Sequence, residues 1–161
     1  MARQESDRED LLREATALVE RVELRLPDEQ ESVVAGFRRD GAASFFFGQS
    51  PVYQFNSHCE LRRAFVDGLL YKTDNGRLVE MRRERTATAV ELRSRQLLPK
   101  ETAKFLLKAQ DCLRRLRDAL LDGTAEVVGQ VPGDQDVAGR VASWLEHLPA
   151  GIVLAKTSRL Q

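Results

Sequence analysis

The sequence contains few of the residues that most often carry catalysis or hold metals. It has two cysteines and two histidines among 161 residues. No C-x-x-C or H-x-x-x-H spacing is present, so the usual zinc-binding patterns are missing. The phosphate-binding P-loop, the glycine motif of dinucleotide-binding folds and the nucleophile elbow are missing as well. We therefore expect neither a metal nor a cofactor.

Long apolar runs are also lacking. No run approaches the roughly 20 residues that a membrane-spanning helix requires. The first residues, Met1 to Asp7, are mostly polar and do not resemble the apolar core of a secretory signal. We therefore expect a cytoplasmic protein that makes no membrane contact. A chain of 161 residues is long enough to fold as one domain, residues 1–161, without a disulfide.

Charge is balanced over the whole chain but is unevenly distributed. The net charge is zero, while residues 1–35 carry −5 and residues 60–100 carry +4. The two segments are expected to attract each other within one fold. An isoelectric point of about 6.8 argues against a strong nucleic-acid footprint.

The middle of the chain, residues 31–95, has the period of β-strands. Apolar residues alternate in short runs, and Asp40-Gly41, Asp67-Gly68 and Asn75-Gly76 separate three pairs of runs. Asp-Gly and Asn-Gly are the strongest short-range hairpin signals, because type I′ turns need positive φ at both central residues. The spacing predicts a curved antiparallel β-meander of about six or seven strands, shaped like a barrel or half-barrel.

Helical periodicity flanks this meander on both sides. We expect an N-terminal helix over residues 6–25, although Val22, Leu24 and Leu26 also alternate as a strand would. Pro99 suits the first turn of a long helix over residues 99–122, and a last helix is expected over residues 134–147. Residues 124–133 are interpreted as a connector. The fold class predicted is α+β.

Two neighbouring residues are the weak candidates for catalysis. His58 and Cys59 lie in a predicted turn. A nucleophilic cysteine needs a base within hydrogen-bond reach and a third group that orients the base. Adjacent turn residues seldom provide this arrangement, so we lean toward a protein that is not an enzyme.

Arginines and aromatics on the predicted sheet are the candidates for binding. Arg62, Arg82 and Arg83 belong to an arginine-rich set that could bind an acidic protein or RNA, since guanidinium groups bind carboxylates and phosphates bidentately. A competing interpretation is a solvated face whose charges protect edge strands. Few exposed aromatics accompany the arginines, which weakens the RNA interpretation.

The aromatics favour a different function. Tyr53, Phe65 and Tyr71 are expected on one concave face, which is either sealed core or an open cup for an apolar ligand. From the sequence we favour a non-catalytic binding or adaptor module that uses the arginine-rich sheet face or a helix face. A protein partner is expected, and a homodimer stays open. Three competing hypotheses are the ligand-binding cup, an enzyme with a Cys/His site, and RNA binding.

Overall fold

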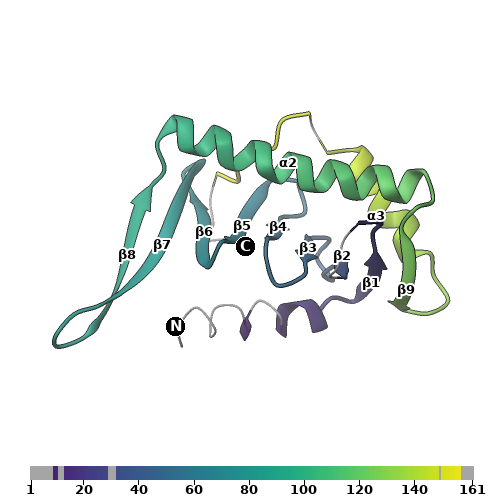
Figure 1. Cartoon of the computed structure of the whole chain (residues 1–161), viewed down its shortest axis with the longest axis horizontal. Helices are drawn as coiled ribbons and strands as arrows, with labels where there is room; N and C mark the ends of the chain where they lie inside the picture. The colour runs from purple at the N-terminus through teal and green to yellow at the C-terminus, as the bar shows by residue number, and fades with distance from the viewer. Residues whose placement is uncertain (1–8, 11–12, 29–31, 149, 157–161) are drawn as a thin grey trace.

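One open antiparallel sheet organises the computed structural model, which describes residues 9–10, 13–28, 32–148 and 150–156. Within these residues the sheet has nine strands in the order β8-β7-β6-β5-β4-β3-β2-β1-β9. Figure 1 shows three layers: the long helix α2 runs across one face of the sheet, and the N-terminal helix lies against the other. The α+β class and the curved meander are confirmed, and the sheet is not closed into a barrel.

Seven of the strands form the predicted meander. Each pairs with the strand that follows it in the chain. Their bounds are Val33–Phe37 (β2), Ala43–Phe47 (β3), Val52–Phe55 (β4), Leu61–Val66 (β5), Leu69–Asp74 (β6), Arg77–Arg85 (β7) and Val90–Gln96 (β8).

The predicted turn chemistry explains two of the hairpins directly. Asp67 and Gly68, between β5 and β6, both have positive φ, as do Asn75 and Gly76 between β6 and β7. These are the dihedral signs of a type I′ turn, whose twist matches that of the flanking strands.

The N-terminal helix ends earlier than the sequence indicates. Part of the predicted range 6–25 lies outside the described residues, and Glu20–Arg25 is a strand, β1, so the prediction of helix there is wrong. The period of two at Val22 and Leu24 decided the structure, because both side chains are fully buried. Gly36 of β2 permits the close approach of β1, since a Cβ atom there would lie 1.9 Å from the carbonyl oxygen of Glu20.

A second strand was missed in the stretch interpreted as a connector. Residues Glu126–Val131 form β9, which pairs with β1. Before it, α2 (Pro99–Leu121) carries the chain from the β8 edge to the opposite edge. A helix of 23 residues is about 34 Å long, and nine strands about 4.8 Å apart span a similar distance. The last helix, α3 (Val137–Glu146), follows β9.

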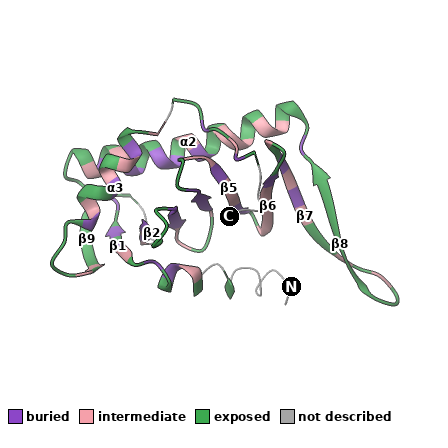
Figure 2. Cartoon of the chain, turned by 180° about the vertical axis from the view of Figure 1, so that it is seen from behind, coloured by how far each residue is buried: buried purple, intermediate pink, exposed green. Residues whose placement is uncertain are grey.

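Apolar cores fill both faces of the central strands. On one face, Phe45 and Phe55 pack against Trp144 of α3, with ring centroids 5.2 and 5.0 Å apart, and the apolar side of α2 covers their neighbours. On the other face, Phe46, Val52 and Phe65 pack under Ala15 and Leu18 of the N-terminal segment. Figure 2 shows this burial in the central strands, whereas β8 is exposed throughout. No helix in the described part of the chain is long and apolar enough to span a membrane.

Candidate functional site

The hairpin of β7 and β8, residues 77–96 and here called the arm, projects past both helical layers. Figure 1 shows its tip extending well beyond α2 and the N-terminal helix. All seven residues of β8 are exposed. The arm carries six arginines and three glutamates, a net charge of +3. It is thus the least covered and one of the most charged parts of the described fold.

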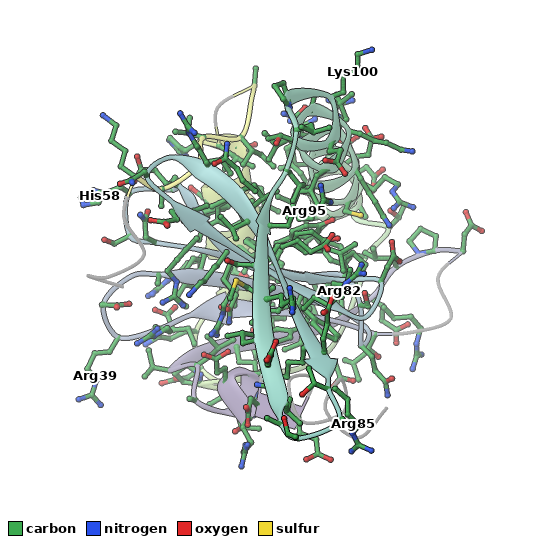
Figure 3. All side chains as sticks on the ribbon, turned by 90° about the vertical axis from the view of Figure 1, so that its left-hand side faces the viewer. Arg39, His58, Arg82, Arg85, Arg95 and Lys100 are labelled. Carbon is green, nitrogen blue, oxygen red and sulfur yellow. The ribbon has the colours of Figure 1, made fainter. Side chains whose placement is uncertain are left out.

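Ion pairs organise the arm on the side that faces α2. Glu80, the least exposed of its glutamates, lies 3.3 Å from both Arg82 and Arg95. Arg93 lies 2.8 Å from Glu84 of the opposite strand and 3.1 Å from Glu91. Figure 3 views the arm end-on, with Arg82 and Arg95 labelled. The charges therefore hold β7 and β8 together, as expected for cross-strand pairs of opposite sign.

The opposite side of the arm combines apolar and basic residues. Val90 and Leu92 are 43% and 61% exposed, large values for aliphatic side chains. They lie opposite Arg85 and Arg83 of β7, which share that side of the hairpin. An exposed strip of this kind is a usual mark of a protein-binding surface.

The outer edge of β8 presents backbone groups as well as side chains. Thr86 N–H donates to the Ala89 carbonyl at 2.8 Å, and Leu97 N–H donates to the Leu78 carbonyl at 2.9 Å. Every second pair of an antiparallel ladder is bonded in this way. In the observed register, residues 91, 93 and 95 therefore bond toward β7. The N–H and C=O groups of residues 90, 92, 94 and 96 point away from it, toward the side where the described residues place no strand.

The aromatic candidates do not form an open cup. Tyr53 is fully buried beneath Phe105 of α2, whose ring also lies 4.8 Å from that of Tyr71. Phe65 belongs to the other core, so the expectation that it shares a face with Tyr53 and Tyr71 is wrong. Tyr53 lies opposite Ala64 and Phe65 opposite Val52, and successive residues of a strand alternate between its faces. The aromatic side of the sheet is core.

The Tyr53 hydroxyl is a buried polar group without a hydrogen bond among the described residues. It faces the thiol of Cys112, but the geometry falls short of a hydrogen bond. Burial is the main cause that raises the pKa of Tyr53 far above its usual value, and the proximity of Cys112 adds to it.

The arginine candidates do not gather in one patch. Arg82 and Arg83 belong to the arm, whereas Arg62 belongs to β5, where the pairing with β4 contains a bulge. The Nε atom of Arg62 is buried without a hydrogen-bond partner in the described part of the chain. Burial, followed by the neighbouring Arg63 and Arg38, lowers the pKa of this guanidinium group. Arg62 is therefore a half-buried residue beside the sheet, distinct from the arm.

His58 and Cys59 lie in a loop that is organised by Asn56. The Asn56 side chain accepts hydrogen bonds from the backbone N–H groups of His58 and Glu60, each at 3.0 Å. Cys59 has a positive φ of 63°. Burial raises the pKa of its thiol, which disfavours the thiolate that a nucleophile needs. The two side chains are adjacent, and their surroundings do not favour nucleophilic catalysis.

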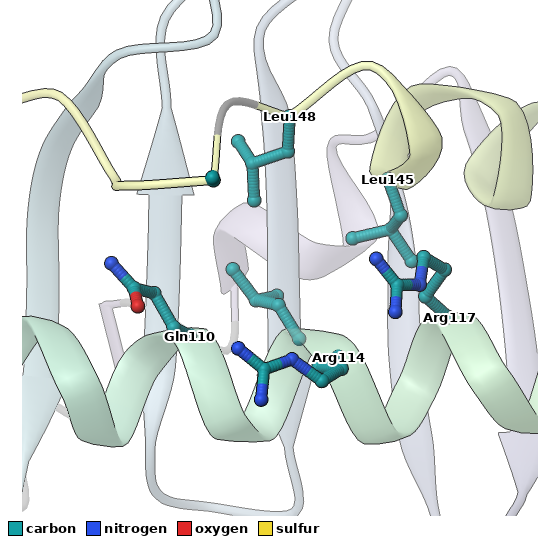
Figure 4. Close-up of a pocket in the computed structure, with 7 residues that line it drawn as sticks. Gln110, Arg114, Arg117, Leu145 and Leu148 are labelled. Atoms are coloured by element: carbon teal, nitrogen blue, oxygen red, sulfur yellow. The ribbon is translucent and has the colours of Figure 1, made fainter.

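A shallow pocket of about 190 Å³ lies between α2 and the end of α3. Figure 4 shows Arg114 and Arg117 at its rim and Leu145 and Leu148 beside them. Each arginine has an acidic neighbour, because Arg114 lies 3.8 Å from Asp111 and Arg117 lies 3.0 Å from Asp118. Its full lining is Gln110, Leu113, Arg114, Arg117, Leu145, Leu148 and Ala150. With its arginines already paired, the pocket is a weaker candidate than the arm.

The described residues contain no cluster of three or more histidine, cysteine, aspartate or glutamate side chains that could hold a metal ion. No family model, curated protein or solved structure matches the chain. The assignment of a site therefore depends on the geometry of this molecule.

Sequence reasoning named two arm residues, Arg82 and Arg83, but missed the edge of β8. The signal was present in the segment Val90-Glu91-Leu92-Arg93, whose apolar and charged residues alternate. Such a strand just before a long helix is a reasonable candidate for the last strand of a meander, and the last strand has an unpaired side.

Proposed function

We propose that the protein is a non-catalytic binding module whose arm takes up an extended segment of a partner protein along the outer edge of β8. The observation that carries this proposal is the row of outward backbone groups at residues 90, 92, 94 and 96. An unpaired edge of this length is a template for strand addition, in which main-chain hydrogen bonds supply affinity.

The side chains of β8 indicate which partner fits. On the side facing α2, an added strand would lie next to Glu91, Arg93 and Arg95, so acidic residues are favoured opposite the two arginines. On the other side it would lie next to Val90 and Leu92, which favours apolar residues. The matching segment alternates acidic and apolar residues.

A labelled peptide tests this proposal. We expect a short peptide of alternating glutamate and valine to bind the protein, measured by fluorescence anisotropy, and a lysine–valine peptide to bind about tenfold more weakly or not at all. Ser94→Pro should abolish binding, because proline removes an outward N–H and leaves the bonds to β7 intact. Ser94→Ala, which keeps that N–H, is the matched control.

A charge reversal separates loss of binding from loss of folding. Arg93→Glu should reverse the preference, so that the lysine–valine peptide binds better than the glutamate–valine peptide. A misfolded arm cannot produce such a reversal. Equal binding of the two peptides by the unmodified protein, or binding unaffected by Ser94→Pro, would overturn the proposal.

A further inference from the structure

The edge of β8 also complements itself, and this property defines one particular partner. A strand that pairs with its own copy across a two-fold axis must run antiparallel to it. Each side chain then lies opposite one on the same face of the joined sheet. The residues of β8 that bond outward, 90, 92, 94 and 96, are of one parity and can therefore bond to the same set in a second copy.

Charge decides among the registers in which two copies of β8 can meet. A pairing centred on Arg93 sets this arginine against its own copy, and one centred on Ser94 sets Arg93 against Arg95 twice. A pairing centred on Glu91 opposes two glutamates. Like charges directly opposite each other destabilise a sheet. These three registers are disfavoured.

A pairing centred on Leu92 has no such conflict. It places Glu91 opposite Arg93 of the second copy, and by symmetry Arg93 opposite the second Glu91. These pairs fall at the positions without outward hydrogen bonds, where side chains of opposite strands come closest. The exposed Leu92 meets its own copy, and Val90 meets Ser94. About six backbone hydrogen bonds would join the two edges.

Resting on the proposed function, we infer that the partner of the β8 edge is a second copy of this chain, paired antiparallel in the register centred on Leu92. The place of the arm leaves room for it. Residues 90–94 lie in the projecting part of the hairpin, past the end of α2 (Figure 1). Two copies joined here form one continuous sheet with a helical layer on each face of each half.

Two single charge reversals and their mixture test the inference. The unmodified protein should dimerise between micromolar and hundreds of micromolar concentration, as measured by sedimentation velocity. Glu91→Arg alone and Arg93→Glu alone should each remain monomeric, because each opposes like charges twice. A mixture of the two variants should form a heterodimer, since arginines at 91 and 93 then face glutamates at 93 and 91. The double variant carrying both changes should dimerise again.

The outcomes distinguish this inference from the proposed function. A protein that stays monomeric but binds the glutamate–valine peptide overturns the inference and leaves the proposed function standing. A dimer that persists in both single variants and in Ser94→Pro uses another surface, which also overturns it. A protein that neither dimerises nor binds the peptide overturns both. Heterodimer formation by the mixture alone can arise only from the register centred on Leu92.

Discussion

Arg95 at the base of the arm and Glu101 in the first turn of α2 form an ion pair with an Nη1–Oε1 distance of 2.9 Å. The same carboxylate accepts a hydrogen bond from the backbone N–H of Leu98, also at 2.9 Å. Arg95 reaches Glu80 of β7 as well. One arginine therefore joins both strands of the arm to the start of the helix that crosses the sheet.

The first prediction concerns the titration of Glu101. The hydrogen bond from Arg95, then that from Leu98, lowers the pKa of this carboxyl to about 2. Its stabilising effect on the folded state is fully present above the unfolded pKa near 4.5 and is lost as the pH falls toward 2. NMR titration should place its midpoint near 2, and Arg95→Ala should move that midpoint toward 4.5. Arg93→Ala, the matched control, should leave it unchanged.

The buried hydroxyl of Tyr53 gives the second prediction. Because it has no hydrogen bond among the described residues, Tyr53→Phe removes a desolvated polar group at no loss of packing. We expect the free energy of unfolding to rise by about 1 kcal/mol. Urea unfolding followed by the fluorescence of Trp144, the single tryptophan, measures it. The half-buried Tyr71→Phe is the control, and a loss of stability in Tyr53→Phe would show that the hydroxyl makes a bond.

Tyrosine ionisation gives the third prediction. Burial raises the pKa of both tyrosines, so the folded state keeps these protons when the unfolded chain loses them near pH 10. The free energy of unfolding should therefore fall as the pH rises above 10. Absorbance at alkaline pH should show tyrosinate appearing together with unfolding. Early ionisation of both tyrosines in the folded protein would contradict this expectation.

Two glycines in the sheet provide a matched pair for the fourth prediction. Gly36→Ala drives a Cβ atom into the backbone of β1 and should cost about 1–3 kcal/mol or more. Gly129→Ala on β9 meets no atom within 4 Å and should change stability by less than about 0.5 kcal/mol. Equal effects in urea unfolding would show that β1 and β2 do not approach so closely.

The reactivity of Cys59 is the fifth prediction, and it tests the enzymatic hypothesis. Because burial raises the pKa of the thiol, alkylation by iodoacetamide at neutral pH should be slower than that of free cysteine. The measurement is made in a Cys112→Ala background, so that one thiol is counted. A rate well above that of free cysteine would restore the catalytic interpretation.

Local chemistry made the meander predictable. Asn75-Gly76 specifies its turn within two residues, and the alternation on either side specifies the strands. β9 could not be found in this way, because its valines at 127, 128 and 131 are exposed and its partner β1 lies about a hundred residues earlier. Its pairing depends on where α2 delivers the chain.

The candidate site was predictable only in part. The arginine-rich character of residues 82 and 83 is visible in the sequence, but the face on which each side chain lies is not. Across each loop the assignment of faces must be made again, and one error moved Phe65 to the wrong core. A bulge likewise separated Arg62 from the other arginines. The open edge of β8 is a property of the complete topology.

The pairing of β9 with β1 also bears on how the chain folds. During synthesis β1 emerges early and must wait for the whole meander and α2 before its second neighbour exists. Contacts so distant in sequence form late and slow the final step of folding. A nascent chain halted after α2 would therefore expose a second unpaired edge beside the arm's own, and that intermediate is the species most in need of a chaperone.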